Sequence, residues 1–146
     1  YLDPGESIRT SDLELAEERH GVRVGPGDAL LIRTGWYERR VELGPPPDRQ
    51  HASGLHAETL PWLRVRDVAV IAGDGAHDVI PSGYTIRRPI HKVGMVAMGL
   101  CLIDNCRFDD LAAACRSLER SEFMFVVAPL RWRSGTVSPI TPLAIF

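Results

Sequence analysis

Long apolar runs, a basic surface and paired cysteines are all missing from this 146-residue sequence. No apolar stretch approaches the roughly 18 residues of a membrane span, and residues 1–20 lack a charged region followed by an apolar one. The formal net charge of −2 provides no positive field for a nucleic acid. We therefore expect a soluble, cytoplasmic protein that has neither a membrane nor a nucleic acid as a partner.

The cysteines are few and unpaired. Cys101, Cys106 and Cys115 form an odd set without a Cys-x-x-Cys pair, which argues against a disulfide framework and a zinc ribbon. A nucleophilic Cys106 would need a neighbouring base and a lowered pKa, and the sequence indicates neither. We expect reduced cysteines that serve in packing.

Length and apolar content predict one domain over residues 1–146, because 45% apolar residues suffice for a single core. Short strands alternate with short helices, a pattern typical of an α/β fold with polar strand ends gathered in one region. A capping box of Ser11 and Glu14 predicts a helix from Thr10 or Ser11 to Gly21. Further helices are expected over 57–65, 91–98 and 109–118, strands over 29–32, 68–72, 100–103, 123–128 and 140–146, and a proline-rich surface loop over 44–53.

His91 and Asp104 are the predicted catalytic and metal-binding residues. Pro89 fixes the backbone before His91, which opens a predicted helix, so the imidazole is held at an element boundary. Asp104 closes an apolar strand, where a carboxylate needs water, a cation, a helix N-terminus or a metal. Both residue types are metal ligands, and together they form half of a metal site suited to zinc, manganese or iron. The alternatives are a hydrogen-bonded core histidine and an Asp104 that caps the next turn.

Polar residues at other strand ends provide further candidates. Asp74, His77 and Asp78 follow a predicted strand in a glycine-rich turn, where Asp74 is the better functional candidate and Asp78 is expected to stabilise the turn. Arg33 and Thr34 end another strand and could bind a substrate carboxylate or carbonyl. The hydroxyl of Ser138 lies in a turn that lacks a base, so its role is binding or structural. The predicted substrate-binding residues are Arg33, Thr34, Asp74 and Ser138.

The chain resembles the cyclase-type metal-dependent hydrolases, the superfamily that includes bacterial kynurenine formamidase and isatin hydrolase. The resemblance implies a swivelling β/β/α fold with a mixed sheet, usually a homodimer. It also implies zinc or manganese that activates water against an amide or lactam carbonyl of a small molecule. Arylformamidase activity, from N-formylkynurenine to kynurenine, is one reaction of this kind. The matching segments are 25–28, 31–36, 54–56, 62–63, 68–70, Asp74, 89–91, Gly99, 104–105, 129–130 and 138–140.

The chain departs from the family at three places. The position matching His91 lies in the family's active site, whereas the position matching Asp104 is commonly a glutamate. Aspartate is one methylene shorter, so Asp104 either binds a metal directly, binds through water or only orients His91. The family's main ligand motif, His-x-Gly-Thr-His-x-Asp-x-Pro-x-His, is absent, which suggests that the chain corresponds to the C-terminal portion and that the N-terminal part is missing. The family's Thr-Gly-Ser-Pro turn carries Val137 in place of glycine, and valine resists positive φ.

Two other functions remain open from the residues alone. A truncated or inactive relative could serve as a binding or assembly module that folds without metal. A domain that needs no metal could instead hold a small polar ligand through Arg33 and the turn at Asp74.

Overall fold

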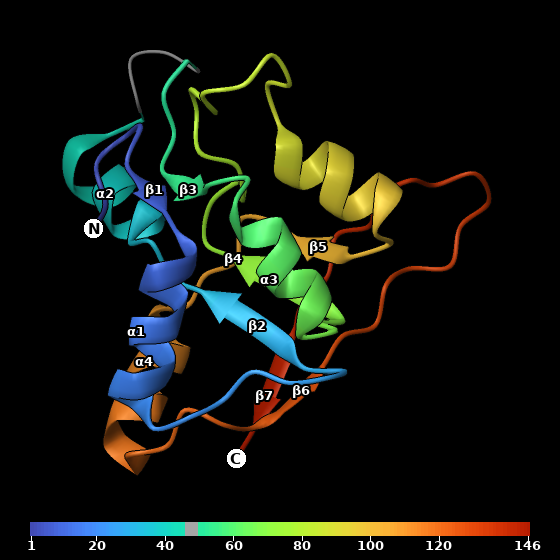
Figure 1. Ribbon diagram of the computed structural model, residues 1–146. Helices are drawn as coiled ribbons and strands as arrows, with labels where there is room; N and C mark the ends of the chain where they lie inside the picture. Colours follow the sequence, from blue (N-terminus) through green and yellow to red (C-terminus); the bar gives the residue numbers. More distant parts are fainter. Residues whose placement is uncertain (46–49) are drawn as a thin grey trace. The chain divides into compact units, whose positions relative to one another are not determined.

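The computed structural model describes residues 1–45 and 50–146 (Figure 1). The chain divides into two compact units, Tyr1–Phe108 and Asp109–Phe146. Part of the expected loop 44–53 lies outside the described residues. The expectation of a single domain stays a prediction.

A parallel sheet of three strands organises the first unit (Figure 1). Its strands are β2 (Ala29–Ile32), β4 (Val70–Gly73) and β5 (Cys101–Ile103). Strand β4 lies in the centre, where Ile71 and Ala72 are completely buried. The register pairs Ile32 with Gly73 and Ala72 with Ile103, so the carboxyl ends of all three strands meet at one edge. All three strands were predicted: β2 has the predicted bounds, β4 starts two residues later and ends one residue later than predicted, and β5 starts one residue later.

Helices and a small strand pair complete this unit. They are α1 (Thr10–His20), α2 (Trp36–Leu43), α3 (Thr59–Val65), the π-helix η1 (Ile90–Ala97), and the parallel pair of β1 (Ser7–Ile8) with β3 (Gly54–Leu55). The buried core cluster includes Leu13 of α1, Leu60 and Leu63 of α3, Ile71 of β4 and Ile90 of η1. Burial of such side chains contributes about 1.5–3 kcal/mol each. The core thereby fixes η1, which carries His91, against the sheet.

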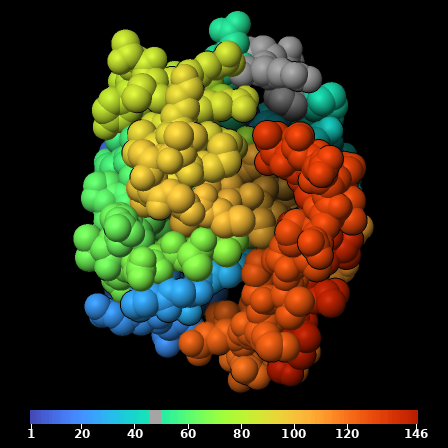
Figure 2. All heavy atoms as spheres, turned by 90° about the vertical axis from the view of Figure 1, so that its right-hand side faces the viewer, coloured from blue at the N-terminus to red at the C-terminus, as the bar shows by residue number. Residues whose placement is uncertain are grey.

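The helix at His91 is of the π type and begins one residue earlier than predicted. Its Gly94 lies close to α3, because a Cβ built there would be 3.3 Å from Leu60 Cδ2. On the other side, Met95 and Val96 are 47% and 76% exposed, and the gold atoms of this region form surface in Figure 2. Only one face of η1 is therefore committed to the core.

Helix α1 has a different cap from the one predicted. Arg9 is the N-cap residue, and Asp12 Oδ2 accepts the backbone N–H of Arg9 at 2.7 Å. The predicted box of Ser11 and Glu14 is therefore wrong, because Arg9 and Asp12 form the box two residues earlier, whereas the start at Thr10 is one of the two predicted starts. Gly21 ends the helix as predicted, with a φ of 63° that glycine adopts without strain.

The second unit consists of α4 (Asp109–Leu118) and an antiparallel pair of β6 (Met124–Val126) with β7 (Leu143–Ile145). The helix has the predicted bounds, and both strands are shorter than predicted. None of residues 109–146 is buried. Within the described residues, no helix is both long enough and apolar enough to cross a membrane.

Candidate functional site at the sheet edge

Polar residues follow each strand of the parallel sheet at its carboxyl edge. Thr34 comes shortly after β2, Asp74 directly after β4, and Asp104 directly after β5. Backbone hydrogen bonds also join the segments, with Asn105 N donating to Gly75 O at 3.2 Å and Cys106 N to Gly73 O at 2.9 Å. The predicted gathering of polar strand ends is confirmed, and such edges commonly carry the ligand sites of α/β proteins.

Both carboxylate oxygens of Asp74 accept hydrogen bonds from residues of the same chain. Its Oδ1 accepts the backbone N–H of Thr34 at 2.8 Å and the hydroxyl at 2.7 Å. Its Oδ2 accepts the N–H groups of Gly35 at 2.7 Å and Trp36 at 3.1 Å, at the start of α2. The side chain is only 4% exposed. Asp74 therefore holds the β2–α2 turn, and the substrate binding predicted for Asp74 and Thr34 stays a prediction.

The other two predicted substrate-binding residues also have partners. Arg33 forms an ion pair with Glu38 of α2. Ser138 belongs to the second unit, where its hydroxyl accepts the Leu130 N–H at 2.8 Å and donates to Pro139 O at 2.9 Å. Val137 is not among the residues of positive φ, so its side chain causes no backbone strain there. Substrate binding by Arg33 and Ser138 stays a prediction.

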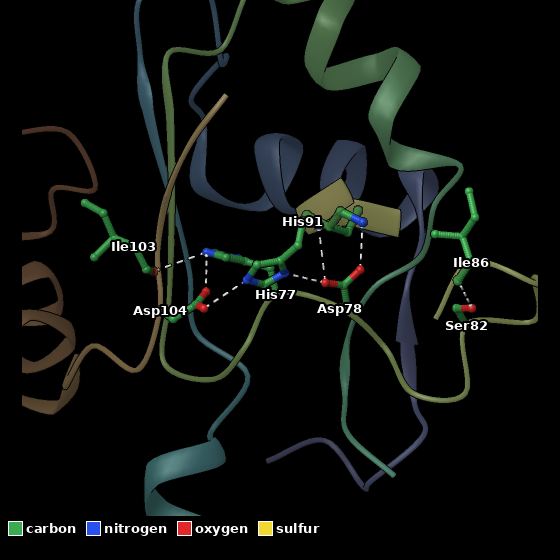
Figure 3. Close-up of polar contacts among 8 residues, drawn as sticks. His77, Asp78, Ser82, Ile86, His91, Ile103 and Asp104 are labelled. Atoms are coloured by element: carbon green, nitrogen blue, oxygen red, sulfur yellow. Dashed lines mark hydrogen bonds and ion pairs between the residues drawn. The ribbon is translucent and has the colours of Figure 1, made fainter. Parts of the chain in front are cut away.

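Two histidines and two aspartates form the centre of the site, and we call them the His–Asp cluster: His77, Asp78, His91 and Asp104 (Figure 3). The ring of His91 lies between two carboxylates, with Nδ1 2.5 Å from Asp78 Oδ2 and Nε2 3.1 Å from Asp104 Oδ2. The third contact joins His77 Nε2 and Asp104 Oδ1 at 3.5 Å. The structure thus brings the two predicted catalytic residues, His91 and Asp104, into direct contact.

Asp78 is the residue of this cluster that sequence reasoning undervalued, because its place in a glycine-rich turn favoured a purely local role. Its Oδ1 accepts the Ile90 N–H at 2.7 Å, so the carboxylate also binds the first turn of η1. The side chain is 1% exposed. The available signal was His91 itself, since an imidazole fixed at a helix start needs a partner for each ring nitrogen.

Charge and burial set different protonation states for the two histidines. Hydrogen bonds to Asp104 and Asp78 raise the pKa of His91 to about 9, so its ring is protonated at neutral pH. Burial lowers the pKa of His77 and outweighs the negative charge of Asp104. The neutral His77 donates through Nε2 to Ile103 O at 3.2 Å, because a carbonyl can only accept. Burial raises the pKa of Asp104, but the hydrogen bond from His91 and the nearby imidazoles produce a net lowering.

The cluster offers two ligands to a metal ion. Across residues 1–45 and 50–146, no group of three or more His, Cys, Asp or Glu side chains could hold a metal. However, Asp104 Oδ1 is buried without a hydrogen-bond partner among the described residues, and Asp104 Oδ2 faces His91 Nε2 at 3.1 Å. Two ligands about 2.1 Å from one zinc ion lie about 3.4 Å apart at the tetrahedral angle, which is close to the 3.1 Å between these two atoms. The pair therefore fits a divalent cation as part of a larger ligand set.

Cys106 borders this site as a thiol. Burial, followed by the negative charges of Asp104 and Asp74, raises its pKa to about 11. A thiol with this pKa is protonated at neutral pH and is a poor nucleophile. The raised pKa agrees with the expectation that Cys106 is not a nucleophile.

The fold is that of cyclase-type proteins. A solved structure described as a novel cyclase matches 99% of this chain and 48% of its own, with a TM-score of 0.82 and 27% identity. Isatin hydrolase A from Ralstonia solanacearum matches 97% of this chain and 54% of its own, with a TM-score of 0.76 and 22% identity. A protein described as a potential metal-dependent hydrolase with cyclase activity reaches a TM-score of 0.65 and 17% identity, over 95% of this chain and 58% of its own.

The sequence leads to the same family. The Cyclase family model, described as a putative cyclase, matches residues 2–77, just over half of the chain, and the chain belongs to this family. No curated protein matches it. The chain spans about half the length of the solved structures described above. The predicted family resemblance and the α/β cyclase-like fold are both confirmed.

Proposed function

We propose that this chain forms part of a metal-dependent hydrolase that cleaves a carbon–nitrogen amide or lactam bond in a small molecule. Arylformamidase activity is the finer form of the proposal. One observation carries it: the His91 ring is fixed between Asp78 and Asp104 at the carboxyl edge of the parallel sheet. Membership of the Cyclase family and the fold shared with isatin hydrolase support the proposal.

His91 and Asp104 are the proposed metal ligands, and zinc or manganese is the proposed ion. A bound ion of this kind lowers the pKa of a coordinated water and stabilises the developing oxyanion. His91 must release the proton at Nε2 before that nitrogen can act as a ligand, since a protonated imidazole has no free lone pair. Asp78 keeps the ring in place while Nε2 loses its proton, because Asp78 Oδ2 lies 2.5 Å from His91 Nδ1.

We propose four substrate contacts, of which Arg33 follows strand β2 directly. Arg33 could bind a carbonyl or carboxylate of the substrate once it leaves Glu38. We also propose Thr34, Asp74 and Ser138 as substrate contacts, although each of them already has a partner within the chain. A homodimer and a cytoplasmic location complete the proposal, and light scattering and cell fractionation test them.

Metal analysis followed by hydrolysis assays tests the proposed function. The protein is dialysed, its zinc and manganese content per chain is determined, and formamides and lactams are then offered as substrates. In an active preparation His91→Ala should lower turnover by at least about 100-fold, as expected for loss of a catalytic imidazole. The exposed His20 of α1 gives the matched control, and His20→Ala should leave turnover unchanged. Near-normal turnover of His91→Ala would refute the assignment.

A binding module that works without metal is the second candidate. It is favoured by one observation, the lack of a group of three metal-ligating side chains among the described residues. Such a module should show a ligand-induced rise in melting temperature that survives treatment with a chelator. Loss of that shift with the chelator would favour the hydrolase.

A further inference from the structure

We propose that Asp78 is a positioning residue that keeps a proton on Nδ1 of His91, so that Nε2 is the nitrogen that acts beside Asp104. The inference deepens the proposed function and rests on it, because it concerns how His91 is prepared for its role. It also makes a statement about the protein itself that can be measured without substrate or metal.

The position of Asp78 is fixed by backbone contacts with β3. Leu55 N donates to His77 O at 2.7 Å, and Val79 N donates to Leu55 O at 3.3 Å, so the segment on both sides of Asp78 is tied to one strand. A Cβ built on Gly54 would lie 2.5 Å from His77 O. Only glycine at position 54 permits this approach, and the carboxylate of Asp78 is therefore presented to η1 from a rigid support.

Each oxygen of Asp78 has its own donor. Oδ1 accepts the backbone N–H of Ile90 at 2.7 Å. Oδ2 accepts the backbone N–H of His91 at 3.4 Å and lies 2.5 Å from His91 Nδ1. A backbone N–H can only donate, so Oδ1 of Asp78 can only act as an acceptor here. The imidazole must therefore donate a hydrogen bond from Nδ1 to Oδ2, and the proton stays on Nδ1.

The two carboxylates on the His91 ring are unequal. The Asp78 side chain is 1% exposed, whereas that of Asp104 is 30% exposed and lies farther from the ring, at 3.1 Å. A buried carboxylate that loses a donor pays a desolvation cost of about 1–3 kcal/mol or more, while a partly exposed one recovers part of this cost from water. A neutral His91 ring therefore keeps the proton at Nδ1, and its Nε2 lone pair faces Asp104. Carboxylates commonly fix the tautomer of a functional imidazole in this way.

The tautomer of His91 is measurable by nuclear magnetic resonance. Protein with 15N-labelled histidine is recorded at a pH at which the ring is neutral, and the His91 signals are identified by their loss in His91→Gln. The expected result is a protonated Nδ1 and an unprotonated Nε2. A wild-type ring that carries its proton on Nε2 would overturn the proposal.

Asp78→Asn sharpens the test, because the amide offers one acceptor oxygen and one donor group. The Ile90 N–H donates to the amide oxygen, so the NH2 group faces Nδ1. Because NH2 can only donate, Nδ1 must accept, and the ring proton should move to Nε2. The matched control is Asp104→Asn, in which the proton should remain on Nδ1. An unchanged Nδ1 proton in folded Asp78→Asn would contradict the proposal, and if that variant does not fold, the wild-type and Asp104→Asn spectra decide. Absence of metal binding or hydrolysis would count against the proposed function and leave these spectra unaffected.

Discussion

The Asp74 side chain, at the carboxyl edge of the parallel sheet, stabilises the fold through hydrogen bonds to the β2–α2 turn. It accepts hydrogen bonds from Thr34, Gly35 and Trp36, where its negative charge also faces the N-terminus of α2. We predict that Asp74→Ala lowers the free energy of unfolding by about 3 kcal/mol, because several buried donors lose a charged acceptor. Urea denaturation followed by circular dichroism measures this change.

Glu14→Ala provides the control for Asp74, since Glu14 is an exposed carboxylate on α1. Its loss should change stability by no more than about 0.5 kcal/mol. A stable Asp74→Ala variant with strongly weakened substrate binding would instead support the predicted role in substrate binding.

The sequence located the important side chains better than it located their partners. Asp74, His91 and Asp104 could be singled out because each stands at the end of a strand or the start of a helix. The contact between Asp78 and His91 depends on how the segment between them returns to β3, and no spacing in the sequence reports that path. Asp78 therefore looked like an ordinary turn residue.

Between elements, a partly buried ion pair connects α1 with the end of α3. Arg66 contacts Glu17 through both terminal nitrogens, at 3.2 and 3.0 Å, and donates to Val24 O at 2.9 Å. Its guanidinium also lies 4.8 Å from the ring centre of Trp62. The side chains of Arg66 and Glu17 are only 18% and 13% exposed. We therefore expect this pair to be strongly coupled.

A double-mutant cycle tests this coupling. Glu17→Ala and Arg66→Ala should each cost about 2–4 kcal/mol, because each leaves a partly buried charge unpaired. The coupling energy between them should be about 1–3 kcal/mol. The exposed pair of Arg64 and Asp67, at 3.8 Å, is the control and should show no more than about 0.5 kcal/mol. Equal coupling in both pairs would show that burial does not strengthen the first.

Elements with a strong apolar pattern or with capping residues were predictable, and elements that have neither were not. The strands β2, β4 and β5 are apolar runs bounded by turn residues, so they could be predicted. Helix α2 has no buried residue, and its N-cap residue is Gly35 in a left-handed conformation. Neither an apolar periodicity nor an N-cap side chain in the sequence therefore indicated this helix. The strands β1 and β3 have two residues each, which is too short for any alternation to be detected.

For the whole molecule, the two units differ in how they bury apolar side chains. Every buried apolar residue among the described positions lies between Leu13 and Phe108. The second unit leaves Met124, Val126, Leu143 and Ile145 exposed on its strand pair. Composition alone predicted one core, and it could not show that this core is confined to the first unit.

This difference predicts the behaviour of the separated units. Residues 1–108 contain the complete parallel sheet and the buried core, so this fragment should unfold cooperatively and keep slow amide exchange in β4. Residues 109–146 should be largely unfolded alone, because α4 is shorter than the roughly 12 residues of a marginally stable isolated helix, and an isolated strand pair is marginal as well. Hydrogen exchange of the two fragments measures both expectations. Amides that exchange slowly in isolated residues 109–146 would contradict this expectation, because they would show that the second unit is stable without buried apolar residues.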